Sequence, residues 1–296
     1  MQTFVLGLML FLTMPVWATV GYIDTINGPP NAFSLTDSNG KNKLLAPGTP
    51  LQKGDRITIS KRNQKHSITL ILNGKTKTIN FTSYKYYIVS GYNRKPDSWT
   101  ESFLKKSANW LRSVWIYDSK DKAATITRGT KSDQRPLLRM GLLKKNAKLL
   151  AGKRKLYLGW YGGKPPFKVQ LRYGKKISSY NTIKHNIHFL KRRFRAGQRY
   201  QILITDAKQN QVRGKFKVVA QSILSYPQAK KIKHSRLLKR QFKKTLLATW
   251  LASLNNGEWM LEAYQQVAGI HHYYPAELVK KGLILGSRPV FRPDRF

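Results

Sequence analysis

The stretch LQKGDRITI, residues Leu51–Ile59, indicates the fold class more directly than any other part of this 296-residue chain. Its centre, Lys53-Gly54-Asp55, has turn chemistry, because glycine readily adopts the positive φ angles that tight turns require. Ile57 and Ile59 follow at alternate positions, which is typical of a strand with one buried face. We therefore expect a small β-module here rather than an enzyme core.

The same pattern of short strand-like runs and turns extends through residues 19–90. The turns are Asn27-Gly28-Pro29-Pro30, Ser38-Asn39-Gly40, Pro47-Gly48 and Asn73-Gly74. The Asn73-Gly74 pair joins two strand-like runs, Ile68–Leu72 and Lys75–Ile79, and this arrangement predicts a β-hairpin. The spacing of the turns predicts a small β-sandwich or β-roll.

Several of these segments resemble the extracytoplasmic FecR-like domain, named for a bacterial iron-citrate signalling protein. They are Val20–Ile23, Asn27-Gly28, Pro50–Ile57 and the hairpin with Asn73-Gly74. The resemblance covers residues 19–90, about a quarter of the chain, and implies a periplasmic binding or signalling module without an activity of its own. No cytoplasmic anti-sigma segment precedes the apolar N-terminus, so we do not expect regulation of a sigma factor.

The first 18 residues carry no charged side chain and contain an apolar run, Phe4–Leu12, followed by Pro15 and Ala18. This composition predicts a signal peptide at residues 1–18 and a periplasmic or secreted protein. An uncleaved segment anchored in the inner membrane is the alternative, because the uncharged run continues to Ile23. The chain has no cysteine, which excludes disulfides, thiol chemistry and cysteine metal sites.

Residues 91–134 form a predicted connector with one short helix. Ser98-Trp99-Thr100-Glu101 has the spacing of a capping box, and apolar residues follow it. Trp99, Trp110 and Trp115 could form an aromatic binding platform. Aromatic residues at this spacing more often belong to a core, and we expect a core role for them.

Residues 135–222 are predicted to be β-rich again. Alternating runs include Phe167–Leu171, Tyr200–Ile204 and Gly214–Val219. Trp160 ends an earlier strand-like run and is followed by a turn rich in glycine and proline. This order of elements resembles a bacterial immunoglobulin-like β-sandwich.

The charge of the chain is extreme, because 55 Lys plus Arg stand against 13 Asp plus Glu and leave a net charge of +42. Residues 151–222 are the most basic part, with 18 Lys plus Arg and a single acid, Asp206. Such an excess predicts an anionic counterpart, since arginine forks suit bidentate contact with phosphate. The predicted polyanion-binding residues are Lys153, Arg154, Lys155, Lys191, Arg192, Arg193, Arg195, Arg199, Arg236, Lys239, Arg240 and Lys243.

For any single residue, a solvated strand face or a guarded sheet edge is the simpler interpretation of these cations. That interpretation does not explain the scarcity of acids, because a mixture of both signs would keep the chain equally soluble. We therefore expect the counterpart to be a broad anionic surface rather than a ligand held in a discrete pocket.

The C-terminal residues 223–296 change to a helical period. Gln228–Leu254 is predicted to form one helix, whose cationic first half projects and whose apolar second half packs. Asn255-Asn256-Gly257 should end it, and Glu258–Ala268 and a segment from Pro275 to Gly282 should form two further helices.

No nucleophile elbow, phosphate-binding glycine loop or zinc-binding helix occurs in the sequence. His185 and His188 are interpreted as structural, and Glu258 and Glu262 as members of a solvated helix face. We expect no cofactor and no metal site. An unrecognised hydrolase would have to bring together Asp55, Asp206 or the His271-His272 pair.

These observations together predict a mainly β fold with α-helices: a FecR-like β-domain, a helical connector, an immunoglobulin-like β-sandwich and a C-terminal helical segment. The expected function is that of an exported, non-enzymatic binding or scaffold protein of the bacterial envelope. Its expected partners are an envelope protein and anionic envelope polymer or lipid head groups. A secreted polyanion-binding or nucleic-acid-binding protein is the alternative, because any such charge would bind nucleic acid in vitro.

Overall fold

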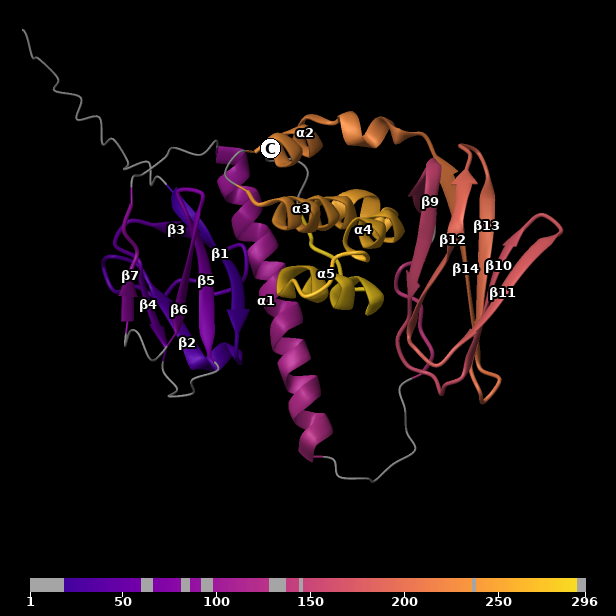
Figure 1. Cartoon of the computed structure of the whole chain (residues 1–296), viewed down its shortest axis with the longest axis horizontal. Helices are drawn as coiled ribbons and strands as arrows, with labels where there is room; N and C mark the ends of the chain where they lie inside the picture. Colours follow the sequence, from indigo (N-terminus) through magenta and orange to yellow (C-terminus); the bar gives the residue numbers. More distant parts are fainter. Residues whose placement is uncertain are drawn as a thin grey trace, which may run out of the picture.

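The computed structural model describes residues 19–59, 66–80, 86–91, 98–127, 137–143, 146–235 and 238–291. Within these ranges the fold is mainly β with α, as predicted, and has four sheets and five α-helices. The elements form successive layers, in which an N-terminal β-module, a long helix, a layer of shorter helices and a β-sandwich follow one another across the molecule (Figure 1). The predicted signal peptide, residues 1–18, lies outside the described residues.

The N-terminal β-module consists of two antiparallel sheets, with strand orders β3-β1-β5-β6 and β2-β4-β7. Its strands are β1 (Thr19–Asn27), β2 (Phe33–Thr36), β3 (Pro50–Gln52), β4 (Arg56–Ile59), β5 (Ser67–Leu72), β6 (Lys75–Asn80) and β7 (Tyr86–Ile88). The turn predicted at Gly54 joins β3 to β4 with a φ of 89° at the glycine. The hairpin predicted at Asn73-Gly74 joins β5 to β6, and both turn residues have positive φ. Both predictions are confirmed.

The connector helix, α1 (Ser98–Thr127), begins where the sequence predicted but spans 30 residues, so the prediction of a short helix is wrong. Its length went unrecognised because it contacts elements on both sides, β3 on one and α5 (Tyr274–Ile284) on the other, and therefore has no single apolar stripe. Trp110 and Trp115 are 7% and 1% exposed, which confirms the core interpretation of these two side chains.

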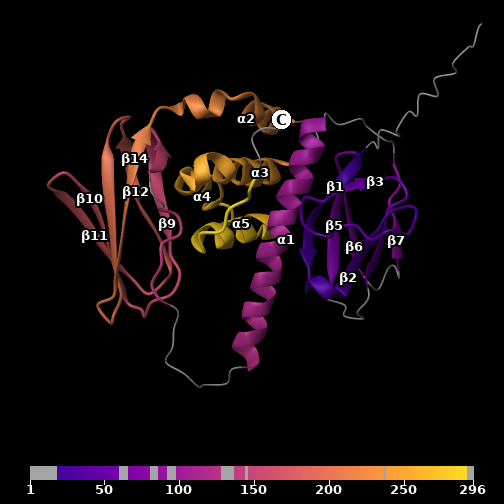
Figure 2. The same ribbon diagram turned by 180° about the vertical axis from the view of Figure 1, so that it is seen from behind.

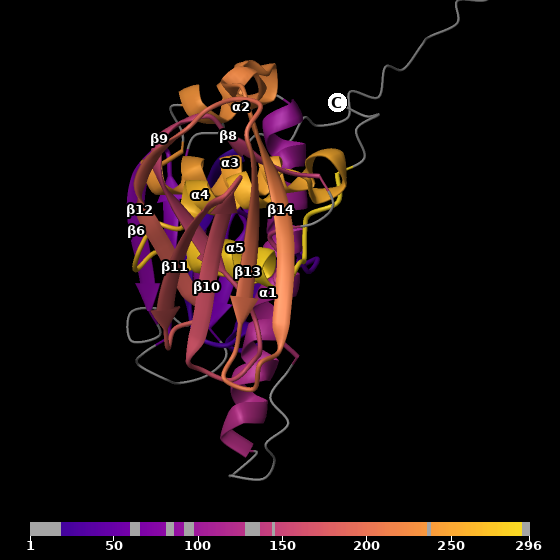
Figure 3. The ribbon, with the colours of Figure 1, turned by 90° about the vertical axis from the view of Figure 1, so that its right-hand side faces the viewer.

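The second β-region forms two sheets, a five-stranded sheet of order β11-β10-β13-β14-β8 and a two-stranded sheet of β12 and β9. Its strands are β8 (Ala147–Leu150), β9 (Gly152–Gly159), β10 (Phe167–Tyr173), β11 (Lys176–Thr182), β12 (Asn186–Phe194), β13 (Arg199–Thr205) and β14 (Gln211–Val219). The two sheets pack through edge-to-face aromatic pairs, Tyr180 with Phe189 and Phe194 with Tyr200. Figure 3 looks onto the five-stranded sheet from the end of the molecule.

The C-terminal segment forms α2 (Pro227–His234), α3 (Arg240–Ser253), α4 (Met260–Val267) and α5. The prediction of one helix over Gln228–Leu254 is wrong, because the backbone of Lys239 is extended and its N–H donates a hydrogen bond to the Tyr22 hydroxyl at 3.2 Å. The first half does not simply project either, since Ile232 of α2 is buried. The ends predicted at Asn255-Asn256-Gly257 and near Pro275 agree with the observed helices.

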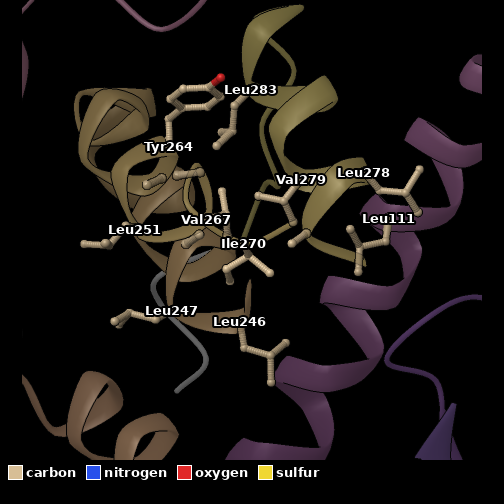
Figure 4. Packing of buried hydrophobic residues seen from close by; sticks show 14 of the residues in the cluster. Leu111, Leu246, Leu247, Leu251, Tyr264, Val267, Ile270, Leu278, Val279 and Leu283 are labelled. Carbon is tan, nitrogen blue, oxygen red and sulfur yellow. The ribbon is translucent and has the colours of Figure 1, made fainter. Parts of the chain in front are cut away.

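The helices α3, α4 and α5 pack around a shared apolar core that also includes Leu111 of α1 (Figure 4). Leu246, Val267 and Val279 are among its buried members. This helical layer lies between α1 and the sandwich in views from both sides (Figures 1 and 2). Among the described residues, no helix has the length and apolarity needed to cross a membrane.

The sandwich is attached to the helical layer through the edge of β9. The side chain of Gln265 on α4 accepts a hydrogen bond from the Tyr157 N–H and donates one to the Tyr157 carbonyl, both at 2.8 Å. The amide group thus takes the place of a neighbouring strand, which satisfies the exposed backbone groups of a sheet edge.

Candidate polyanion-binding groove of the sandwich

The outer face of the five-stranded sheet carries cations on adjacent strands. On β14, Arg213, Lys215 and Lys217 are exposed, whereas Gly214 and Phe216 between them and Val218 after them are buried. This alternation follows from the two-residue period of a strand. The cations therefore all project from the same side of the sheet, away from the core.

The strand register places three cations in one row. Lys217 of β14 lies opposite Arg199 of β13 and beside Lys148 of β8. Directly paired residues of neighbouring strands have Cα atoms about 5 Å apart. Like charges at this spacing destabilise a sheet unless counter-charges are present. A second row crosses β10, β13 and β14, because Gln201 of β13 lies opposite both Lys215 of β14 and Arg172 of β10.

These side chains line a groove of about 1160 Å³. We call it the basic groove and define it by its six cationic lining residues: Lys148, Arg172, Arg199, Arg213, Lys215 and Lys217. Leu143 and Asn146 form part of its wall beside β8, and Gly174 lies at the other side in the β10–β11 turn. Glu258 is the acid among its lining residues.

Glu258 forms an ion pair with one cation of the groove, Lys148. Its carboxylate lies 2.6 Å from the ammonium group of Lys148, and this hydrogen bond holds the pKa of Glu258 below its ordinary value. The Lys148 ammonium also lies over the ring of Trp259. In contrast, Arg199, Lys215 and Lys217 form no ion pair with any acid in the part of the chain that the structure describes.

The predicted cations of β9 and β12 form a second basic surface, separate from the groove. Lys153, Lys155, Lys191 and Arg193 are exposed there, and Lys153 lies directly opposite Arg193. The exposed residue Arg195 follows in the turn after β12. The residues predicted from the sequence therefore include this second surface but only one residue of the groove, Arg199.

Arg154 was predicted to contact a polyanion, and the structure gives it an internal role instead. Its guanidinium group donates hydrogen bonds to both carboxylate oxygens of Glu262 at 3.0 to 3.2 Å. Glu262 is 0% exposed and also accepts a hydrogen bond from the Leu150 N–H. The interpretation of Glu262 as part of a solvated helix face is therefore wrong. Arg192 is likewise half-buried and donates to the Ser178 hydroxyl at 3.1 Å.

The predicted cations around the start of α3 are not one face of a continuous helix. Lys239 precedes α3 and donates a hydrogen bond to the Thr76 hydroxyl of β6 at 2.6 Å. Arg240 is exposed and Lys243 is half-buried on the first turn of α3. Arg236 lies outside the described residues. The break before α3 thus separates residues that were predicted to lie on one side of a single helix.

Five cations of the groove were missed by the sequence prediction: Lys148, Arg172, Arg213, Lys215 and Lys217. The period-two pattern of Arg213, Lys215 and Lys217 was visible in the sequence and could have identified one strand of the site. The pairing of β14 with β13 and β8 was not visible, because strand register depends on contacts between distant segments.

The residues considered for a hydrolase have structural roles in separate parts of the molecule. Burial alone would raise the pKa of Asp206, but hydrogen bonds from the Asn210 side chain and from the backbone N–H groups of Lys164, Asn210 and Lys208 outweigh it and hold the pKa below its ordinary value. Asp55 of the β-module pairs with Lys43 at 2.6 Å. Within the described ranges, no three His, Asp or Glu side chains are grouped as metal ligands.

His185 packs edge-on against Phe167, and His188 packs against Tyr157, so both have aromatic neighbours. His271 and His272 are exposed in the loop between α4 and α5.

No protein-family model matches the chain, and no curated protein matches it significantly. The FecR-like character of residues 19–90 and the immunoglobulin-like character of residues 135–222 therefore stay predictions.

Proposed function

We propose that this protein is an exported, non-enzymatic binding or scaffold component of the bacterial envelope that is retained on anionic envelope material by its basic sandwich. The observation that carries the proposal is the row of Arg199, Lys217 and Lys148 across three paired strands. The acidic side chain beside the row is Glu258, and it is paired with Lys148. A bound anion would relieve the repulsion within the row.

The distribution of acids supports the proposal further. Asp206 is the one acid of residues 151–222, and its carboxylate is occupied by hydrogen bonds within its own loop. The surface of the strands therefore has no negative side chain of its own to balance 18 Lys plus Arg. Solubility alone would be served by interspersed charges of both signs.

The remaining parts of the proposal rest on the sequence and on the arrangement of the layers. Export, to the periplasm or beyond, rests on the uncharged apolar segment at residues 1–18, with an uncleaved anchor as the alternative. A protein partner would add to a strand edge of the FecR-like module. β6 is at such an edge of its sheet and exposes Lys75 and Thr78.

Retention on envelope material provides the test. Purified protein is mixed with isolated bacterial envelopes, and the bound fraction is measured by sedimentation over a range of salt concentrations. We expect binding to persist at about 0.15 M salt and the logarithm of the affinity to fall linearly with the logarithm of the salt concentration. Release well below that concentration, or recovery of the native protein in the cytosol after fractionation, would contradict the proposal.

A further inference from the structure

We propose that the basic groove binds a single extended polymer chain of repeating phosphate groups, and that it does not bind the flat surface of a lipid bilayer. This inference rests on the proposed function and specifies the ligand of the same sandwich. It follows from the shape of the site, the spacing of its cations and the absence of stacking surfaces among its lining residues.

The shape of the site favours a chain over a surface. The groove has walls beside β8 and at the β10–β11 turn, and the paired residues Arg199 and Lys217 come from β13 and β14 between them. An extended chain can lie along such a groove and contact both side chains, whereas a flat bilayer does not match its concave shape. The volume of about 1160 Å³ also exceeds the roughly 300–1,000 Å³ of typical small-molecule pockets, so the groove is large enough for several repeating units.

The spacing of the cations suits phosphate. Neighbours along β14, such as Lys215 and Lys217, are separated by about 7 Å, and cross-strand neighbours by about 5 Å. A phosphate group accepts hydrogen bonds in several directions and can therefore bridge cations on two strands. A planar carboxylate instead pairs best with a single guanidinium fork.

The groove lacks the features that single-stranded nucleic acid sites use to bind bases. Its aromatic lining residues, Tyr200 and Phe216, are 4% and 2% exposed and stack on each other at 5.1 Å between ring centroids. They cannot offer an open ring face to a base, and stacking on such faces is what holds bases in single-stranded nucleic acid sites. The groove would therefore contact the charged backbone of a polymer alone.

The experiment uses inorganic polyphosphate as the probe and the full chain as the protein. Affinity is measured by calorimetry for polyphosphates of increasing length, and in parallel for anionic phosphatidylglycerol vesicles and for polyglutamate. The groove variant combines Arg199→Gln, Lys215→Gln and Lys217→Gln. Its matched control combines Arg112→Gln, Lys53→Gln and Lys105→Gln, which removes the same residue types from exposed positions outside the sandwich. Circular dichroism establishes that both variants are folded.

We expect affinity for polyphosphate to rise with chain length until the groove is filled. The groove variant should lose about tenfold in affinity, because each of three exposed charge contacts is worth a factor of about two or more. The slope of log affinity against log salt should become less steep by about 2 in this variant, at roughly 0.7 for each contact with a flexible chain. The control should keep the parent affinity and slope within about twofold.

A third variant, Glu258→Gln, provides a gain of affinity as a readout that misfolding cannot produce. The Glu258 carboxylate competes with the ligand for Lys148, so its removal should tighten polyphosphate binding about threefold.

Equal losses in the groove variant and the control would overturn the assignment of the groove, because net charge alone would then explain binding. Tight binding to vesicles without an effect of polyphosphate length would overturn the inference of a chain. Equal affinity for polyglutamate would overturn the preference for phosphate. In each of these cases the proposed function would stand, whereas failure to bind any of the three probes at physiological salt would remove the proposed function itself.

Discussion

Replacement of Glu262 by alanine should be among the most destabilising single changes in the sandwich-to-helix contact. The carboxylate is fully buried and accepts hydrogen bonds from Arg154, from the Leu150 N–H and from Gln266. Alanine would leave a guanidinium group without its partner and a backbone N–H without an acceptor. Removal of one partner from a buried ion pair costs about 3–5 kcal/mol of unfolding free energy, and an unsatisfied buried donor costs about 1–3 kcal/mol.

The structure places the expected effect near the lower end of these ranges. The side chain of Arg154 is 24% exposed, so its charge can be partly rehydrated after the substitution. We therefore expect Glu262→Ala to lower the free energy of unfolding by about 3 kcal/mol. Glu262→Gln keeps an acceptor for Leu150 and should cost about half as much.

The assay is urea unfolding followed by circular dichroism, with midpoint and slope compared for each variant. Glu277→Gln is the control, because Glu277 also pairs with a cation, Lys280, but its side chain is 47% exposed. This control should change stability by no more than about 0.5 kcal/mol. The double variant Arg154→Met with Glu262→Gln should be less destabilised than the sum of its single changes. A loss in Glu262→Ala no larger than that in the control would refute the reasoning.

Three further changes test other parts of the fold by the same unfolding assay. Asp206→Asn should lower the free energy of unfolding by about 2 kcal/mol at pH 7. The pKa of Asp206 is lower in the folded than in the unfolded chain, so the carboxylate stabilises the fold above about pH 4. The difference in stability between the variant and the parent should therefore disappear as the pH falls through the folded-state pKa. Equal differences at pH 7 and pH 2 would contradict this. Gly21→Ala should lower the free energy of unfolding by about 3 kcal/mol, because the new Cβ on β1 would lie 1.8 Å from the Ile71 carbonyl oxygen on β5. An unchanged unfolding midpoint would show that β1 and β5 can move apart to accommodate the Cβ. Tyr273→Phe should cost about 2 kcal/mol by removing the 2.6 Å hydrogen bond to the buried Asp24, and a neutral result would mean that Asp24 finds another donor.

Local features of the β-module were predictable because the chemistry that specifies them lies within a few residues. Asn73 and Gly74 both adopt positive φ, which is the backbone geometry that an Asn-Gly hairpin turn requires. Gly54 likewise adopts the φ that its turn needs. Asn255 and Asn256 adopt positive φ where the sequence placed the end of a helix.

Predictions failed where a distant contact decided the local conformation. The chain leaves the helical path before α3, where the Lys239 N–H bonds to Tyr22 and Phe242 stacks on the same ring at 4.5 Å. Tyr22 is more than 200 residues away in the sequence, so no local pattern could reveal the break. The length of α1 was missed for a related reason, because its two packed sides obscure the apolar stripe of an ordinary surface helix.

In the candidate site, too, some features follow from the sequence and others only from contacts between distant segments. The excess of cations in residues 151–222, and the period that sends Arg213, Lys215 and Lys217 to one side of a strand, are properties of the sequence alone. The sequence also determined where several strands and turns of both β-regions would occur, because side-chain alternation and backbone φ preferences act over short distances. Only the tertiary structure decided that Arg199, Lys217 and Lys148 form one row, and that Arg154 is withdrawn to Glu262. The physical reason is that register and ion pairing depend on the packing of segments far apart in the sequence, such as those of Arg154 and Glu262, which are 108 residues apart, and no local preference encodes such packing.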